Sequence, residues 1–419
     1  MMKSEYVDRR TRLAAAMEDN SALLLYAGKA RKRSADSAYP FAVNRNFYYL
    51  TGIRQEETIL LMIKSDSDVK TYLFILEPDE LKEKWVGKRM STLDAKQSSG
   101  ISSILFTNSL LPKLDSVLNP NDYQYGEINT LYLDLDDELK IDDRKTTREL
   151  KSELEQMYKG LNIIDVMPLF INFRSIKSEY EVSLTKEAIK ITEIGLQKIL
   201  TILEPGLYEY NLVNAFEHEI KDNGGEVAFD TICASGKNGV ILHYPEASDM
   251  LGRNDLVLLD LGASVGCYNA DISRTYPVNG KFSTIQRKIY KIVLECNKAV
   301  INYVRPGLTL LELQEFTIDF LAAECVNKGL ILKKEDIKNV YYHNVSHSLG
   351  LDVHDIFDRN RVLEPGMIIT VEPGLYFKDL DIGVRVEDDV LVTPIGSECL
   401  SKDIIKEIED IEKILATKE

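Results

Sequence analysis

The sequence predicts an α/β protein with two domains, and three observations lead to this prediction. The chain has 419 residues, which is long for one hydrophobic core and sufficient for two. Its first part alternates short apolar runs with helical or turn segments, as α/β domains do. After about residue 172, long amphipathic helices appear between the strand-like runs. We therefore expect a mixed α/β domain over residues 1–172 and a second domain, of helices packed on a sheet, over residues 173–419.

The first domain begins with a charged amphipathic segment that predicts a helix over residues 4–20. Apolar runs bounded by turn residues then predict strands. These expected strands cover residues 22–28, 46–53, 58–64, 71–78, 101–106 and 130–136.

The second domain combines a helical and a strand pattern. Helices with an apolar face are predicted over residues 178–203, 212–225, 283–304 and 310–329. Strand runs are predicted over residues 226–235, 256–264, 267–278, 366–377 and 382–393.

Composition restricts the class of protein. A hydrophobic share of 44% and a charged share of 28% are typical of globular proteins, and the net charge of −16 disfavours nucleic acid and anionic membranes as partners. No segment has the apolar length of a signal peptide or of a membrane helix. The five cysteines are odd in number and scattered, which indicates a reducing cytoplasm.

One motif indicates a nucleophile that its context does not support. Residues Gly262 to Gly266 read GASVG, which fits the GxSxG pattern of a nucleophile elbow with Ser264 as the nucleophile. That motif needs a helix directly after the serine, whereas a strand pattern follows here. We therefore interpret the glycines as part of a hairpin turn.

Two aspartates in strand runs are candidates for a site. Asp260 lies in an otherwise apolar strand, which indicates a buried carboxylate, and an ionised carboxylate is costly to bury unless it is paired or binds a metal ion. Asp271 follows eleven residues later, across the proposed turn, so a hairpin brings the two together. Two adjacent carboxylates raise each other's pKa unless a cation lies between them. The structural alternative is that Asp271 pairs with Arg274.

Two glutamates and one histidine have similar settings. Glu372 and Glu387 lie in apolar strand runs, and His347 belongs to the segment YYHNVSHSLGLDVHD, which holds three of the five histidines. Four carboxylates would neutralise two divalent cations, with a neutral histidine as a fifth ligand. Oxygen-rich ligation without thiolates favours manganese, iron or cobalt, with zinc as an alternative. The residues alone leave open whether such a two-metal site exists.

In combination, these segments resemble a known family, the pita-bread metallopeptidases, and among them the Xaa-Pro aminopeptidases (aminopeptidase P). Five segments carry the resemblance within the second domain: FDTICASGKNGVILHY, LLDLGASVGCYNADISRTYPVNG, HNVSHSLGLDVHD, LEPGMIITVEPGLYF and IGVRVEDDVLVT. In the first domain, SADSAYPFAVNRNFYYLTGI and EKWVGKRM are similar to the family's N-terminal domain. The resemblance implies a catalytic domain of helices on a curved, mainly antiparallel sheet.

The resemblance also implies the metal ligands. Asp260 would bind one ion, His347 and Glu372 the other, and Asp271 and Glu387 both. Two divalent ions, manganese first and zinc, cobalt or iron as alternatives, would hold a hydroxide that attacks the peptide bond.

Further residues would act on the substrate. His354 would stabilise the oxyanion, His243 would lie near the scissile amide, and His343 would line the proline pocket. Glu372 would take part in proton transfer, and Arg385 would orient substrate or carboxylates.

The activity that the resemblance implies is hydrolysis of the bond between an N-terminal residue and a following proline. A prolidase that cleaves only Xaa-Pro dipeptides is the first alternative, and a creatinase-like or non-catalytic protein is the second. The family's N-terminal domain implies a homodimer, in which Trp85 reaches a neighbouring active site. For this single tryptophan we prefer packing in a core.

Overall fold

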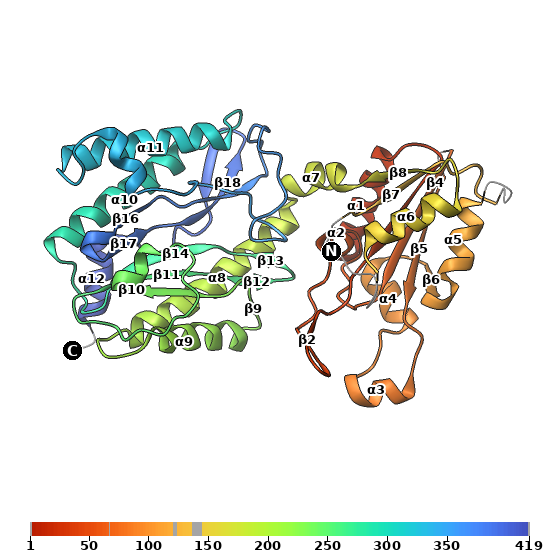
Figure 1. The fold of residues 1–419 in the computed structure, drawn as a ribbon, viewed down its shortest axis with the longest axis horizontal. Helices are drawn as coiled ribbons and strands as arrows, with labels where there is room; N and C mark the ends of the chain where they lie inside the picture. The colour runs from red at the N-terminus through yellow and green to blue at the C-terminus, as the bar shows by residue number, and fades with distance from the viewer. Residues whose placement is uncertain (1, 67, 120–123, 136–144, 418–419) are drawn as a thin grey trace. The chain divides into compact units, whose positions relative to one another are not determined.

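The computed structural model describes residues 2–66, 68–119, 124–135 and 145–417. The chain folds into two compact units, residues 1–171 and 172–419 (Figure 1). In the described part of the chain, no helix has the length and apolarity needed to cross a membrane. The structure therefore contains an N-terminal mixed α/β domain and a C-terminal α/β domain, as the sequence predicts.

The first unit is built on a mixed six-stranded sheet in the order β6-β5-β4-β1-β7-β8. Strands β1, β4 and β5 pair antiparallel, whereas the β5–β6, β1–β7 and β7–β8 pairs are parallel. The strands are β1 (Ser21–Tyr26), β4 (Ile59–Ser65), β5 (Asp68–Ile75), β6 (Ser103–Phe106), β7 (Thr130–Leu133) and β8 (Asn162–Asp165). A separate hairpin is formed by β2 (Lys32–Ser34) and β3 (Ser37–Ala38). The helices are α1 (Met2–Ala16), α2 (Arg45–Thr51), α3 (Glu80–Val86), α4 (Thr92–Ser99), α5 (Leu110–Leu118), α6 (Thr147–Met157) and α7 (Met167–Ser175), the last of which crosses the boundary between the units.

The strand predicted over residues 46–53 is wrong, because this segment forms helix α2. The Asn44 side chain accepts a hydrogen bond from the Phe47 N–H and so caps the start of the helix. Gly52 ends it in the left-handed conformation, with φ of 67°. Capping therefore overrides the strand preference of the aromatic residues between these two positions. The predicted strand over 130–136 ends at Leu133, and residue 136 lies outside the described residues.

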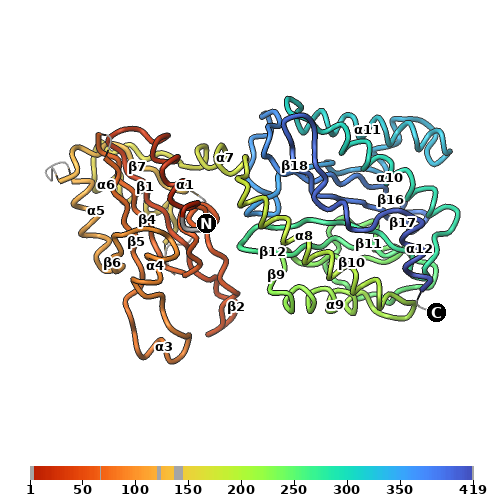
Figure 2. The backbone as a smooth tube through the Cα atoms, turned by 180° about the vertical axis from the view of Figure 1, so that it is seen from behind, coloured from red at the N-terminus to blue at the C-terminus, as the bar shows by residue number. Residues whose placement is uncertain are grey.

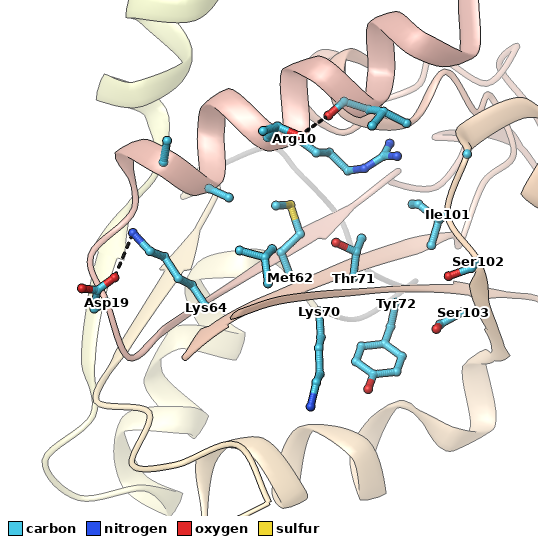
Figure 3. A pocket seen from close by; sticks show the side chains of 16 residues that line it. Arg10, Asp19, Met62, Lys64, Lys70, Thr71, Tyr72, Ile101, Ser102 and Ser103 are labelled. Carbon is cyan, nitrogen blue, oxygen red and sulfur yellow. Dashed lines mark hydrogen bonds and ion pairs between the residues drawn. The ribbon is translucent and has the colours of Figure 1, made fainter. Parts of the chain in front are cut away.

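A pocket of the first unit lies between helix α1 and the sheet (Figure 3). Arg10 lines it, but its guanidinium donates hydrogen bonds to the main-chain oxygens of Leu50 and Ser99. These oxygens lie near the C-terminal ends of α2 and α4, where helix dipoles favour a cation. Lys64, which also lines the pocket, pairs with Asp19. The charges of Arg10 and Lys64 are therefore both paired with groups of the chain itself.

Trp85 lies on α3, a helix with no buried residue, and is itself 84% exposed. The preferred interpretation that it packs in a core is therefore wrong. A single short helix without apolar partners gives the side chain nothing to pack against.

The second unit consists of two antiparallel halves, each covered by helices (Figures 1 and 2). In the first half, α8 (Glu179–Ile202) and α9 (Glu209–Asp222) pack on the sheets β10-β11-β14 and β13-β12-β9. In the second half, α10 (Thr284–Tyr303) packs on the sheets β15-β18-β19 and β16-β17, and α11 (Leu310–Asn327) packs on α10. This is the predicted arrangement of helices on a mainly antiparallel sheet.

Each predicted strand run of this unit is interrupted. The first-half strands are β9 (Glu226–Val227), β10 (Ile232–Ser235), β11 (Leu256–Leu261), β12 (Ala263–Val265), β13 (Tyr268–Asn269) and β14 (Ile272–Pro277). Those of the second half are β15 (Ile368–Val371), β16 (Gly374–Phe377), β17 (Ile382–Arg385), β18 (Asp388–Thr393) and β19 (Gly396–Cys399). Asp271, Glu372 and Glu387 all lie at these interruptions. The breaks therefore hold acidic side chains out of the regular pleat.

The hairpin predicted around Ser264 is present. Gly266 and Cys267 form its turn with φ of 54° and 66°, and both values are left-handed, as tight two-residue hairpin turns require. Ser264 lies in β12 and is followed by a strand and not by a helix, so the nucleophile elbow is excluded.

Candidate metal centre

Segments far apart in the chain converge on one cavity of about 710 Å³ in the second unit. All predicted site residues line this cavity, namely His243, Asp260, Asp271, His343, His347, His354, Glu372, Arg385 and Glu387. The structure thus brings together carboxylates and imidazoles that the sequence places up to 144 residues apart.

The strands fix the position of the acids. Asp260 on β11 lies opposite Ile232 of β10 and Ser273 of β14. The main-chain N–H of Glu387 donates to the Ser273 oxygen at 3.0 Å, which joins the two halves of the unit beside the acids. The Ser273 hydroxyl donates to Glu387 Oε2 at 2.7 Å. Ser273 therefore holds Glu387 close to Asp260 through both its main chain and its side chain.

Asp271, His347 and Glu387 form the tightest group, because one ligand atom from each lies within 4.8 Å of the others. His347 Nε2 lies 3.4 Å from Asp271 Oδ2 and 3.5 Å from Glu372 Oε1. His347 Nδ1 lies 3.2 Å from the Ser348 main-chain oxygen, so this nitrogen carries the proton. Nε2 is then free to offer its lone pair to a metal ion, as histidine ligands do.

His347 owes its position to an irregular segment. Its main-chain oxygen accepts from the Thr370 N–H at 3.0 Å, and the Leu349 N–H donates to the Ile368 oxygen. Residues 341–355 thus lie along the edge of β15 with one isolated bridge, Ser348 to Ile369, and form no regular strand.

The charges of the group are poorly compensated by the chain itself. Burial raises the pKa values of Asp271 and Glu387, and their acidic neighbours raise them further. Burial also raises the pKa of Glu372, to about 7. The Asp260 Oδ1 atom is buried and has no hydrogen-bond partner among the described residues. Such a donor set fits divalent cations, which would neutralise the carboxylates and occupy the orphaned oxygen.

Arg385 connects Asp260 to the histidines. Its Nη2 lies 2.6 Å from Asp260 Oδ2, and its Nη1 donates to the Tyr376 hydroxyl at 3.0 Å. That hydroxyl lies 2.9 Å from His343 Nε2, while His343 Nδ1 lies 2.8 Å from the Asn344 oxygen. Because Nδ1 must then be the donor, Nε2 accepts the proton of Tyr376. Arg385 is therefore buried in a hydrogen-bonded network that joins Asp260 to His343 through Tyr376.

The other three histidines of the cavity, His354, His343 and His243, differ from one another in burial and in their neighbours. The rings of His354 and His347 have centroids 4.1 Å apart. Burial lowers the pKa of His354, and the neighbouring His347 lowers it further. Burial and Arg385 lower the pKa of His343 to about 4, so both imidazoles are neutral near pH 7. His243 is exposed at the cavity wall.

Sequence reasoning missed three residues that support the site. Tyr376 and Ser273 make the contacts described above, and Gln314 on α11 binds the histidine segment through the His343 oxygen and the Val345 N–H. Ser273 lies two residues after Asp271 within the strand run predicted over residues 267–278, so the period of two of that predicted strand could have indicated it. A polar residue within a helix, such as Gln314, carries no comparable signal.

The fold and this site together define a metal-dependent hydrolase. Residues 183–394 match the model of metallopeptidase family M24, and residues 6–125 match that of the aminopeptidase P N-terminal domain. The chain is 34% identical to the Xaa-Pro aminopeptidase of Escherichia coli (strain K12), over 99% of this chain and 98% of that protein.

Two solved structures have the same fold. A structure from Bacillus anthracis assigned as an aminopeptidase P has a TM-score of 0.95 and 40% identity, and covers 100% of this chain and 99% of that one. The Escherichia coli aminopeptidase P with the inhibitor Pro-Leu has a TM-score of 0.91 and 32% identity, with the same coverage. The chain therefore belongs to metallopeptidase family M24, in its aminopeptidase P group, and has the pita-bread fold.

A buried ion pair anchors the segment that carries His354. Asp355 contacts the Arg174 guanidinium and lies 3.1 Å from Lys177 Nζ, and all three side chains are at most 2% exposed. Burial alone would raise the pKa of Asp355, but Arg174 and Lys177 outweigh it and lower the pKa below its usual value.

We expect Asp355→Asn to lower the free energy of unfolding at pH 7 by about 3–5 kcal/mol, because two buried cations lose their shared carboxylate. The stabilisation is present above the unfolded-state pKa of about 3.9 and is lost as the pH falls through the lower folded-state value. Urea unfolding followed by circular dichroism should therefore show a difference between the two proteins that shrinks below about pH 4. The control is Asp319→Asn, at an exposed position of α11. A difference that is equal for both variants, or independent of pH, would contradict this role.

Proposed function

We propose that the chain is an Xaa-Pro aminopeptidase, which hydrolyses the bond between an N-terminal residue and a following proline. The observation that carries the proposal is the convergence of four carboxylates and His347 in one cavity, within a chain that is similar to such enzymes over its full length. In this proposal, residues 173–419 form the catalytic domain.

Two divalent ions fit the donor set. Asp260 would bind one ion, His347 and Glu372 would bind the other, and Asp271 and Glu387 would contact both. When bound, the ions would supply Lewis acidity and a hydroxide near neutral pH. Carboxylate-rich ligation favours manganese, with zinc, cobalt or iron as alternatives.

The chain's own residues would orient the substrate and stabilise charge. His354 is neutral and can donate an N–H to the oxyanion that develops at the scissile carbonyl. His243 would face the scissile amide and His343 the proline ring, since both line the cavity. Glu372 would accept and return a proton at a carboxylate oxygen. Arg385 would keep the Asp260 carboxylate in place.

We also propose a cytoplasmic homodimer. The cytoplasm is supported by the five cysteines, all of which are free thiols. The dimer is supported by helix α3, which exposes Leu81, Trp85 and Val86 by 69%, 84% and 81%. An exposed apolar cluster of this kind is typical of a protein contact.

We expect the purified chain, supplied with manganese, to release arginine from Arg-Pro-Pro. His347→Ala should lower kcat/KM by more than about 100-fold, because losing a ligand exceeds the usual effect of losing an outer-shell partner. His218→Ala is the matched control, since His218 is exposed on α9 outside the cavity. Chromatography of the released arginine measures kcat/KM for the unchanged chain and for both variants.

Full activity of His347→Ala would contradict the site. Cleavage of Xaa-Pro dipeptides without cleavage of Arg-Pro-Pro would instead establish a prolidase.

We further expect the chain to bind about two divalent ions, the number that four carboxylates neutralise. Plasma mass spectrometry after dialysis against manganese measures the metal content directly. Glu387→Gln should bind less metal, whereas Glu398→Gln on β19, which lies outside the cavity, should bind as much as the unchanged chain. No bound metal in the unchanged chain would refute the site independently of any activity.

Sedimentation equilibrium should give about twice the chain mass of 47.6 kDa, since an exposed apolar cluster can be buried by a second copy. Trp85→Ala should weaken this association, whereas Leu332→Ala, at a position 94% exposed outside α3, should not. A monomer at every concentration would exclude the dimer.

A further inference from the structure

His243, which lines the metal cavity, lies on a segment that forms no strand. This segment follows β10, begins with the short 3-10 helix η2 (Gly236–Val240) and continues irregularly to Asp249. We call residues 236–249 the His243 segment. It has no ladder of backbone hydrogen bonds to hold it, so the position of His243 depends on contacts with other elements.

One buried carboxylate joins the two ends of the His243 segment. Glu209, the first residue of α9, is 0% exposed. Its Oε1 accepts hydrogen bonds from the Ser235 N–H at 2.7 Å, from the Ser235 hydroxyl at 2.8 Å and from Asn238 Nδ2 at 3.1 Å. Its Oε2 accepts from the Asp249 N–H at 2.9 Å. Because Ser235 precedes the segment and Asp249 ends it, this side chain closes the segment into a loop.

The contacts of Glu209 require a carboxylate. All of these partners donate, and a carboxylate only accepts. An amide has one oxygen, and its NH₂ group would face a donor whichever way the amide is turned. In the orientation that keeps the Ser235 and Asn238 contacts, the Asp249 N–H loses its acceptor. The donors therefore distinguish glutamate from glutamine, although the two side chains have nearly the same shape.

The middle of the His243 segment packs against elements that carry other residues of the site. A Cβ atom at Gly383 would lie 1.7 Å from the Gly239 oxygen, so the two backbones are in direct contact. Gly383 lies on β17, which also carries Arg385. The Tyr342 hydroxyl, from the segment of the clustered histidines, donates to the Val240 oxygen at 2.7 Å. These contacts place the middle of the segment, and Glu209 fixes its two ends.

We propose that Glu209 is a positioning residue of the peptidase, whose carboxylate holds the His243 segment so that the imidazole of His243 stays at the cavity wall. Glu209 does not itself line the cavity, so it acts through His243 and not on the substrate. This inference rests on the proposed function and adds to it the group that fixes His243.

Hydrogen exchange of the unchanged chain and of Glu209→Gln, followed by mass spectrometry without substrate, tests the anchoring itself. We expect peptides that cover residues 236–249 to exchange roughly 10- to 100-fold faster in the variant, because a hydrogen bond to a charged acceptor is lost. Glu204→Gln, at an exposed position before α9, is the matched control and should exchange as the unchanged chain does. All three proteins should bind the same amount of manganese, since Glu209 lies outside the metal cavity.

A double-mutant cycle with Arg-Pro-Pro as substrate tests whether Glu209 acts through His243. Glu209→Gln should lower kcat/KM roughly 10-fold, as a small displacement of a substrate-facing group does, and should change the same parameter, kcat or KM, as His243→Ala. In the His243→Ala background it should have less than about a 2-fold further effect, because residues that act through one another are not additive. A general weakening of the fold would lower kcat/KM by the same factor in both backgrounds.

The proposal is overturned if the His243 segment exchanges equally fast in Glu209→Gln and in the unchanged chain, or if both backgrounds lose the same factor. Should Glu209→Gln fail to fold, Asn238→Ala takes its place in both experiments, because it removes one donor to Glu209 and keeps those of Ser235 and Asp249. If the unchanged chain does not cleave Arg-Pro-Pro, the proposed function fails, whereas hydrogen exchange still decides whether Glu209 holds the segment.

Discussion

The second unit is organised around carboxylates that are buried close to one another. Asp271 and Glu387 are 5% and 2% exposed, and they lie with Glu372 beside the partly buried Asp260. Like charges at such distances repel, and the Arg385 guanidinium contacts directly only Asp260 of these four. Asp271, Glu372 and Glu387 lie in breaks between strands, whereas Asp260 lies within β11. Main-chain hydrogen bonds such as that from Glu387 to Ser273 hold the acids in this unfavourable arrangement. Divalent cations would convert the repulsion into ligation, which explains why a site of this composition can be stable.

The sequence alone singled out Asp260 and Glu372, because each is a charged residue in an otherwise apolar run. It did not separate Glu387 from the neighbouring Asp388 and Asp389, so the full set of acids depended on the resemblance to the family. The positions of the four long helices α8 to α11 were also predictable, since their caps and periodicity are local properties. The breaks within the strand runs were not predictable, because β15 and β16 are separated only by Glu372 and Pro373, whose effect depends on the partner strands. Helix α2 was misread for a related reason: aromatic residues favour strands, and the caps at Asn44 and Gly52 were not weighed against them.

The three clustered histidines differ in their contacts, although they share one segment. His347 directs Nε2 at the acids because its Nδ1 is occupied by a main-chain oxygen. His343 instead has both nitrogens engaged, one by Asn344 and one by Tyr376. Which of these histidines can offer a nitrogen lone pair to a metal ion thus depends on which nitrogen the hydrogen bonds leave free, and residue spacing does not contain this information.

The segment that carries these histidines forms no regular secondary structure. Its conformation must therefore be fixed by contacts with other parts of the chain. The Asn269 side chain donates to the main-chain oxygens of Gly350 and Leu351, at 3.0 and 3.1 Å, and Asn269 lies two residues before Asp271. At the other end, Asp355 is fixed by its buried ion pairs and by its N–H bond to the Ser348 oxygen. The loop is therefore tied to the hairpin that supplies one of the acids. A shift of this hairpin would displace Asp271 and the segment that carries His354 together, so the position of one relative to the other is preserved even where regular secondary structure is missing.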